Sequence, residues 1–93
     1  MEYEIVWSDE IVENIRDINN YLLDEWGFLV ADKFADKLIK AVEIIKSNPY
    51  IGRKHDELPA VRQFLITNQN LLCYTVNKNI ITALNLTDSR VNK

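Results

Sequence analysis

The sequence predicts one small α+β domain over residues 1–93, in which an antiparallel helical hairpin packs on one face of a sheet. The length of 93 residues suits a single domain and leaves no length for a second. Apolar residues recur at helical spacing in the first half of the chain and alternate with polar residues elsewhere. Two short asparagine-rich segments separate the last three alternating segments, which is typical of a β-meander.

The first segment alternates, with Tyr3, Ile5 and Trp7 on one face, and this predicts a strand over residues 2–7. Ser8 follows as a typical helix N-cap, and the two acidic residues after it suit the positive end of a helix. We therefore expect the first helix to begin directly after the first strand.

Two helices are predicted from their apolar positions. Gly27 ends the first helix, and we expect it to adopt a left-handed conformation there. The second helix ends before Pro49, because the residue that precedes a proline avoids the helical region. The short connection predicts an antiparallel hairpin. The apolar positions are Ile11, Ile15, Ile18 and Leu22 in the first helix and Ala31, Phe34, Ala35, Leu38, Ala41, Val42 and Ile45 in the second.

Residues 49–60 form the one long irregular segment and contain both prolines and the only histidine. Long loops in compact domains often carry function. Three strands are expected after it, at residues 61–67, 71–76 and 80–87, joined by turns whose asparagines can take positive φ angles. The expected element order is therefore β-α-α-β-β-β.

Composition excludes several classes of protein. Hydrophobic residues make up 47% and charged residues 27% of the chain, which is typical of a globular protein. No apolar segment approaches the roughly 20 residues of a membrane span, and the start of the chain lacks the basic segment of a secretory signal. The single cysteine, Cys73, fits a reducing compartment, and its apolar neighbours predict a core thiol rather than a nucleophile. We expect a soluble, cytoplasmic protein with no membrane partner.

The net charge of −3 combines −6 over residues 1–50 with +3 over residues 51–93. Nucleic-acid-binding proteins are usually basic overall, so an anionic partner would have to contact the second half of this chain. An acidic, solvated helix pair beside an ordinary sheet is the alternative interpretation.

No sequence motif of high specificity is present: there is no glycine-rich phosphate loop, paired CxxC, HExxH or GxSxG. One histidine and one cysteine cannot form an ordinary zinc site, so we expect no metal and no cofactor. The remaining candidates are cations of the second half, which a meander can bring together on one concave surface where they would suit a phosphodiester. They are Arg53, Lys54, His55, Arg62 and Arg90.

Within this group, His55 has the one side chain whose ordinary pKa suits acid–base chemistry near neutral pH. Arg62 alternates with Phe64 and Ile66, so it lies at the rim of the sheet if those two residues face the core. The alternative is that these cations are solvated or pair with nearby acids, Arg53, Lys54 and Arg62 with Asp56, Glu57 and Asp88.

In the order and spacing of several short segments, the chain resembles the RelE/ParE superfamily of type II toxin–antitoxin toxins. The segments are YEIVWS at 3–8, YLLDEWG at 21–27, NPYIGR at 48–53, VRQF at 61–64, LCYTV at 72–76 and DSRVN at 88–92. The resemblance implies a toxin that is neutralised by a small antitoxin, with which it forms a hetero-oligomer.

Two mechanisms occur in this superfamily. RelE-like members cleave mRNA on the ribosome, whereas ParE-like members are not enzymes and inhibit DNA gyrase. By resemblance, Arg62 and Arg90 match arginines of the ribonuclease branch, and Lys54 and His55 lie where other members place loop cations or an acid–base group.

The sequence departs from the ribonuclease branch in three respects. No tyrosine or histidine follows Thr87, Lys93 stands where a proline often ends the motif, and the isoelectric point is near 5.0. We therefore favour a ParE-like inhibitor of gyrase, which blocks replication, over a RelE-like ribonuclease. A non-toxic homologue that only binds antitoxin remains a third reading.

An antitoxin could add a strand to a sheet edge or lay an amphipathic helix in a groove. Trp26, Phe28, Tyr50 and Arg53 are the candidate contacts, because exposed aromatic and arginine residues dominate many interfaces. Core packing is the alternative for Trp26 and for Tyr21. The acidic first half favours a basic antitoxin segment.

Overall fold

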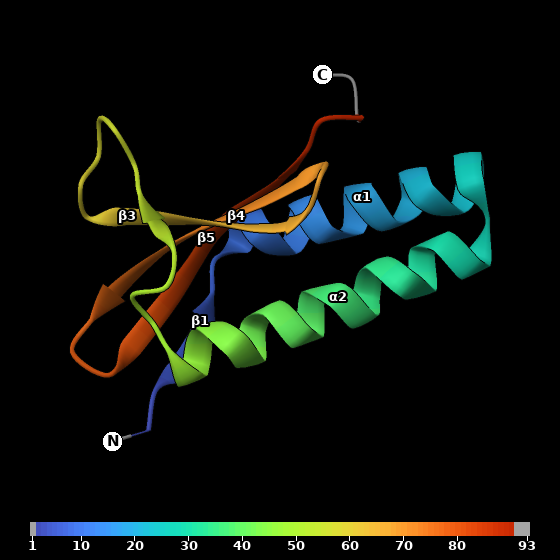
Figure 1. The fold of residues 1–93 in the computed structure, drawn as a ribbon. Coiled ribbons are helices and arrows are strands. Elements are labelled where there is room, and N and C mark those ends of the chain that lie inside the picture. Colours follow the sequence, from blue (N-terminus) through green and yellow to red (C-terminus); the bar gives the residue numbers. More distant parts are fainter. Residues whose placement is uncertain (1, 91–93) are drawn as a thin grey trace.

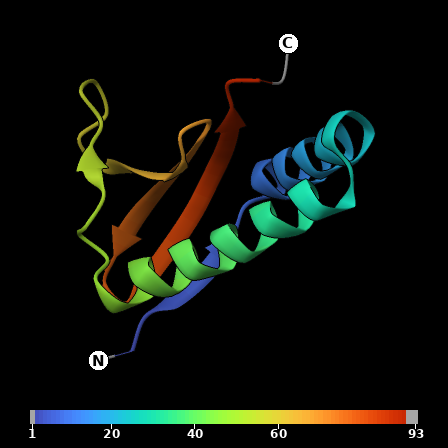
Figure 2. The same cartoon turned by 45° about the vertical axis from the view of Figure 1, so that its right-hand side comes forward.

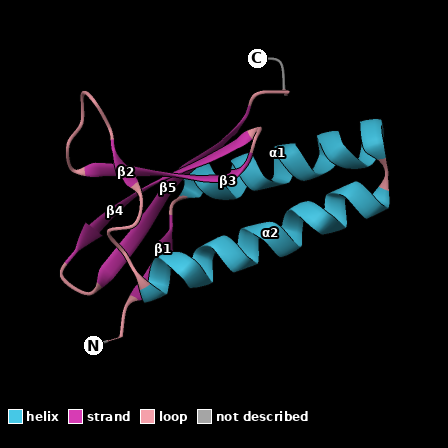
Figure 3. Cartoon of the chain, in the orientation of Figure 1, coloured by secondary structure: helices cyan, strands magenta, loops and turns pink. Residues whose placement is uncertain are grey.

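A helical hairpin covers one face of a twisted five-stranded sheet in the computed structural model, which describes residues 2–90 (Figures 1 and 3). The α+β class and the order of the predicted elements are confirmed, and the loop contributes one further, very short strand. The elements are β1 (Glu4–Trp7), α1 (Asp9–Trp26), α2 (Phe28–Ser47), β2 (Arg53–Lys54), β3 (Val61–Thr67), β4 (Asn70–Asn77) and β5 (Ile80–Asp88).

The strands lie in the order β1-β5-β4-β3-β2. Strands β3, β4 and β5 form the expected antiparallel meander, and β2 pairs antiparallel with the outer edge of β3. Strand β1 pairs in parallel with β5, so the earliest strand lies beside the latest one, a pairing that alternation alone does not reveal. Ile5 lies opposite Ile81 in this pair.

Tight turns join the meander strands, but the positive φ angle is not where the sequence predicts it. Residues 68–69 connect β3 to β4, and residues 78–79 connect β4 to β5. Among the described non-glycine residues, the positive φ belongs to Lys78, at 56°, and not to an asparagine. Asn70 and Asn77 instead lie at the two ends of β4, and Asn68 and Asn79 lie in the turns with negative φ.

Both predicted ends of α1 are observed, the second with a different geometry. The Ser8 hydroxyl accepts a hydrogen bond from the Ile11 N–H (3.1 Å) and donates one to the Leu84 carbonyl (2.6 Å). Gly27 has φ 92° and ψ 175°, a conformation confined to glycine but outside the left-handed helical region that the sequence predicts. Its N–H donates to the Leu22 carbonyl (2.9 Å), which closes the last turn of α1.

The core lies between the hairpin and the sheet. Helix α1 packs over β5 and α2 lies toward β3, as the turned view shows (Figure 2). Every buried helix position belongs to one of the two predicted apolar stripes, but the stripe prediction is wrong for Ala35, which is exposed, and Ile15 and Val42 are only partly buried. The buried hydrophobic residues are Ile11, Ile18, Leu22, Ala31, Phe34, Leu38, Ala41 and Ile45 from the helices and Leu72, Tyr74, Ile81, Ala83 and Leu86 from the sheet.

Cys73 does not belong to this core. It alternates with the buried Leu72 and Tyr74, so its side chain lies on the sheet face away from the helices, where it is half-buried. Burial raises the pKa of the Cys73 thiol, against an opposing hydrogen bond from Gln63. The raised pKa agrees with a thiol that is not a nucleophile.

The closed end of the hairpin extends beyond the sheet (Figures 1 and 2). As a result Trp26, Phe28 and Leu29 are 59%, 69% and 78% exposed. Core packing is therefore wrong for Trp26, whereas Tyr21 packs partly against the core as expected. Neither described helix is long and apolar enough to cross a membrane.

Candidate functional site

Arg62 lies at the rim of the sheet, where the alternation with Phe64 and Ile66 predicts it. One nitrogen of its guanidinium (Nη1) donates hydrogen bonds to the carbonyls of Tyr50 (3.2 Å) and Gly52 (2.9 Å). The guanidinium also lies over the Tyr50 ring, 4.9 Å from its centroid. Arg62 therefore holds the segment that leads from α2 into β2.

Tyr74 fixes the same segment from inside the core. Its hydroxyl accepts a hydrogen bond from the Gly52 N–H (2.9 Å) and donates one to the Pro49 carbonyl (2.7 Å). Burial raises the pKa of this phenol, against the opposing Gly52 hydrogen bond and the Arg62 charge, so the hydroxyl keeps its proton. A Cβ at position 52 would lie 2.6 Å from the Tyr74 oxygen, which is why a glycine occupies it.

The other loop cations are exposed or half-buried at this end of the sheet. Lys54 is opposite Arg62 in the β2–β3 pair, and both lie on the face that the helices cover. Arg53 is opposite Gln63 on the other face, beside a cavity of about 500 Å³. The Nδ1 atom of His55 accepts hydrogen bonds from the N–H groups of residues 57 and 58, at 3.0 and 3.1 Å. This ring nitrogen therefore stabilises the turn of its own loop.

Arg90 belongs to a polar cluster at the opposite end of the meander. Its Nε and Nη2 donate to the two carboxylate oxygens of Asp88 at 3.0 and 2.7 Å, and its N–H donates to the same carboxylate at 2.7 Å. The amide of Asn70 donates a further hydrogen bond to Asp88 at 2.8 Å. The Asp88 side chain is fully buried and that of Arg90 is 27% exposed.

The pKa values follow from these contacts. Burial on its own raises the pKa of Asp88, but the hydrogen bonds from Arg90 and Asn70 outweigh it and hold the pKa below its ordinary value. The same contact with Asp88 raises the pKa of Arg90, with a smaller contribution from the nearby Tyr21 phenol. The arginine–aspartate pair is therefore ionised throughout the physiological pH range.

A small cleft opens beside Arg90, between α2 and the β3–β4 turn. We call it the basic cleft; its volume is about 140 Å³. Lys33 and Lys37 project from successive turns of α2 and contribute two further cations to it. The full lining is Leu22, Val30, Lys33, Phe34, Lys37, Thr67, Gln69, Asn70 and Arg90.

Sequence reasoning placed the α2 lysines on a solvated face and missed their part in this cleft. Their spacing carried a usable signal, because residues four apart in a helix lie on the same side, which places Lys33 next to Lys37 on α2. Only the tertiary structure shows that this side borders the turn next to Arg90.

The structure does not bring the two candidate arginines together. Arg62 is opposite Tyr74 in the sheet, whereas Arg90 follows Asp88, which is opposite Asn70. Four residues of β4 separate these positions, or about 13 Å of strand. The predicted convergence on one concave surface is therefore wrong, and two basic regions lie at opposite ends of the meander.

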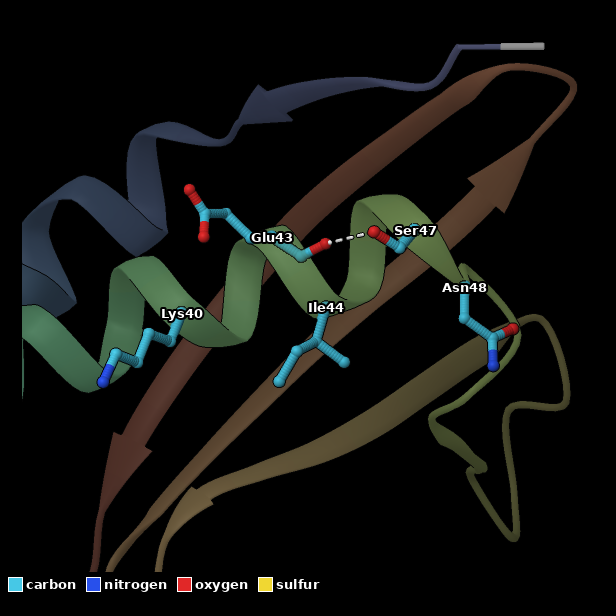
Figure 4. Close-up of a pocket in the computed structure, with 5 residues that line it drawn as sticks. All are labelled: Lys40, Glu43, Ile44, Ser47 and Asn48. Carbon is cyan, nitrogen blue, oxygen red and sulfur yellow. Dashed lines mark hydrogen bonds between the residues drawn. The ribbon is translucent and has the colours of Figure 1, made fainter.

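A third hollow, of about 400 Å³, lies along the second half of α2 (Figure 4). Ile44 and Asn48 point to one side of the helix there and Glu43 points to the other, while the Ser47 hydroxyl donates to the Glu43 carbonyl (3.1 Å). Ile44 is 44% exposed and the nearby Tyr50 is 56% exposed. This part of the surface offers apolar contacts to a partner.

No cluster of three His, Cys, Asp or Glu side chains within residues 2–90 could hold a metal ion. The candidate groups among these residues are arginines and lysines, which bind anions by charge and hydrogen bonding. Of the C-terminal DSRVN motif, Val91 and Asn92 lie outside the described residues, as does Lys93.

The fold and these basic regions define a class of small α+β proteins that includes structurally known toxins. A chain of the chromosomal ParDE toxin–antitoxin system from P. aeruginosa superposes with a TM-score of 0.78 at 16% identity, over 94% of this chain and 96% of that one. The YoeB dimer from Staphylococcus aureus gives 0.67 at 20% identity, over 94% and 97%. A chain of the E. coli DinJ–YafQ toxin–antitoxin complex gives 0.64 at 9% identity, over 97% and 96%.

The sequence itself assigns the family. Residues 5–90 match the model of the ParE toxin of type II toxin–antitoxin systems, parDE. The chain therefore belongs to the ParE toxin family, within the RelE/ParE superfamily. No protein with a curated description matches its sequence significantly.

Proposed function

We propose that this chain is a toxin that inhibits DNA gyrase, and thereby replication, and that a cognate antitoxin neutralises it. The observation that carries the proposal is that Arg62 and Arg90 lie apart and are each bound to other groups of the protein. Arg62 binds backbone carbonyls and Arg90 is clamped by Asp88 about 13 Å of strand away, so they do not frame one phosphodiester. A ribonuclease needs such a shared site with an acid–base group beside it.

The histidine does not supply that group in this arrangement. The Nδ1 of His55 is engaged with two N–H groups of its own loop, at the Arg62 end of the meander and away from Arg90. A binding inhibitor needs no acid–base group, only an exposed surface of matching charge and shape. The exposed cations Arg53 and Lys54 at β2 provide such a surface.

The exposed apolar residues support an antitoxin partner. Large apolar side chains are exposed at the end of the hairpin, at Trp26, Phe28 and Leu29, and further along at Ile44 and Tyr50. An amphipathic antitoxin helix along the hairpin would bury these side chains. Solved relatives support the same pairing, since the S. aureus YoeB–YefM structure is described as a heterotetrameric toxin–antitoxin complex.

The test measures gyrase supercoiling and RNA cleavage with the same purified protein. We expect supercoiling to fall while mRNA stays intact, both free and on ribosomes. In cells, DNA synthesis should fall before protein synthesis after induction without antitoxin. Intact supercoiling with cleaved mRNA would instead establish a ribonuclease, with Arg62, Arg90, Lys54 and His55 as the candidate residues.

A pair of charge-matched variants locates the inhibitory surface. The double variant Arg53→Gln/Lys54→Gln should weaken gyrase inhibition about tenfold, as expected for two interface charges. Lys40→Gln/Lys46→Gln removes the same charge from α2 and should leave inhibition unchanged. Equal effects of the two pairs would show that net charge, rather than a β2 contact, governs inhibition. No effect of the wild-type chain on DNA, protein synthesis or growth would indicate a non-toxic homologue.

A further inference from the structure

The basic cleft is lined by cations and by no acidic side chain. The cations are Lys33, Lys37 and Arg90. Among the described residues, the ion pairs are Arg16–Glu13 and Arg90–Asp88, so neither lysine is neutralised by an ion pair. Two cations therefore face a small space that one anion can fill.

The third cation is held ready for binding. Asp88 fixes the Arg90 guanidinium through Nε and Nη2, and Asp88 is in turn held by the Asn70 amide. Asn70 accepts a hydrogen bond from the Thr67 hydroxyl (2.6 Å), so the cluster connects Arg90 to the β3–β4 turn. Because this geometry exists before binding, little side-chain freedom is lost when an anion arrives.

The surroundings of the cleft favour a protein anion over a nucleic acid. A volume of about 140 Å³ accommodates a single carboxylate-sized group rather than a nucleotide. Val30 lines the cleft, and Phe28 and Leu29 lie exposed directly before it on α2. The first 50 residues also carry a net charge of −6, which repels a chain of phosphates more strongly than one acidic side chain.

We propose that the basic cleft binds one side-chain carboxylate of the antitoxin, from an Asp or Glu flanked by apolar residues that cover Phe28 and Leu29. This inference rests on the proposed antitoxin partner and adds a defined anchor to it. Lys33 and Lys37 would pair with the carboxylate, and Arg90, oriented by Asp88, would donate from its remaining N–H groups.

The first experiment follows the Arg90 Nε–H resonance by NMR during titration with N-acetylglutamic acid α-amide, which carries one side-chain carboxylate. We expect a saturable shift in the millimolar range, as is reasonable for so small a ligand. The shift should be lost in Lys33→Gln/Lys37→Gln and retained in the charge-matched Lys40→Gln/Lys46→Gln. A titration with no saturable shift at Arg90 would overturn the proposal.

A second titration uses a pentathymidylate oligonucleotide and, separately, inorganic phosphate. The proposal expects neither to shift Arg90 at lower concentration than the carboxylate probe. If the oligonucleotide binds tighter at Arg90, the cleft is a phosphate site for nucleic acid and the carboxylate proposal is wrong.

The third measurement is the affinity of the chain for the antitoxin encoded beside it. Lys33→Gln/Lys37→Gln should bind about thirtyfold more weakly, as expected for two charged contacts at an interface, while the charge-matched Lys46→Gln/Lys78→Gln, whose lysines line neither the basic cleft nor the α2 hollow, stays within about threefold of wild type. Equal affinities of the two double variants would contradict the anchor. Gyrase inhibition is measured on the same proteins, which separates the two proposals. If the basic cleft does not contribute to antitoxin binding but gyrase is inhibited, only the carboxylate proposal fails. If the cleft contributes but gyrase is not inhibited, only the proposed gyrase inhibition fails.

Discussion

At the scale of single residues, Arg62 and Asp88 use their charged side chains to hold backbone groups in place. Arg62 holds two carbonyls of the segment after α2, and Asp88 holds both the guanidinium and the N–H of Arg90. Buried charge is costly unless it is paired and hydrogen-bonded, and Asp88 meets both conditions. Arg62 and Arg90, which the sequence alone could place on the surface as solvated cations, therefore take part in the hydrogen bonds that hold the fold together.

The variant Asp88→Asn tests how much the Asp88–Arg90 pair stabilises the fold. The free energy of unfolding should fall by about 2–3 kcal/mol at pH 7, because Arg90 loses its buried counter-charge. The folded pKa of Asp88 lies below its unfolded value, so its contribution is present above about pH 4 and is lost as the pH falls through the folded pKa. In urea unfolding, the difference between wild type and variant should therefore shrink below about pH 4.

Glu13→Gln is the matched control for Asp88→Asn. Its carboxylate pairs with Arg16 at 2.9 Å, but the two side chains are 62% and 59% exposed. Such pairs contribute little, so we expect a change within about 0.5 kcal/mol. Equal losses in the two variants would show that burial of Asp88 does not strengthen its pair.

The roles of single side chains were harder to predict from the sequence than the helices and strands. The sequence identified Arg62 and Arg90 as important, but local spacing does not reveal that the former reaches Gly52 or that the latter pairs with Asp88. Tyr74 appeared only as part of a strand pattern, although its hydroxyl joins Pro49 to Gly52. Apart from the Arg90–Asp88 pair, these contacts join residues that are 10 to 25 positions apart in the sequence. They depend on how the strands are aligned in the sheet, which local sequence patterns do not reveal.

At the scale of elements, the start of α1 is coupled to an irregularity in β5. The register of β4 against β5 shifts between Cys73 and Tyr74, which leaves Leu84 as the extra residue of a bulge. The Leu84 carbonyl is taken up by the Ser8 hydroxyl, and the Leu86 N–H by the Asn14 side chain (2.9 Å). Helix α1 therefore satisfies backbone groups near the bulge in β5.

Ser8→Ala tests this coupling. It removes the N-cap and also leaves the Leu84 carbonyl without its partner, so we expect a loss of about 2 kcal/mol in the free energy of unfolding. Ser47→Ala is the control, because that hydroxyl bonds only to the Glu43 carbonyl of its own exposed helix turn. It should cost less than about 0.5 kcal/mol. Faster amide hydrogen exchange at Ile11 should accompany the first change alone.

Elements were predicted well because their signals are local. The apolar stripes, the Ser8 cap, the proline stop and the asparagine-rich turns each act within a few residues, and the limits of β3 agree at both ends. Strand β2 was missed because two residues within a proline-containing loop carry no alternation. The β1–β5 pairing was not foreseen because it joins segments more than 70 residues apart.

At the scale of the whole molecule, the hairpin and the sheet expose different kinds of side chain. The sheet carries the exposed cations of β2, whereas the projecting hairpin carries the exposed aromatic residues and borders the basic cleft. A partner along the hairpin need not cover β2. Strand β5, over which α1 packs, lies between β1 and β4 in the sheet.

Removal of β5 should therefore abolish the fold. A chain that ends at Asn79 lacks the buried Ile81, Ala83 and Leu86, leaves β1 without a neighbouring strand and exposes the edge of β4 that β5 covers. We expect it to show no cooperative unfolding transition in urea or on heating. Deletion of residues 1–7, which removes only the edge strand β1, should leave a transition at lower stability. A cooperative transition in the first truncation would show that β5 is dispensable.

The central place of β5 also sets an order in time during synthesis on the ribosome. About 40 residues follow the end of α2 before β5 is complete, which takes roughly 2–8 s at 5–20 residues per second. During that interval the residues of both helices have been made, but the sheet is incomplete. Strand β1 cannot join it until β5, which pairs with both β1 and β4, has been made. The newborn chain therefore presents the hairpin before it has an assembled sheet, and an inhibitor that binds the hairpin can meet it first.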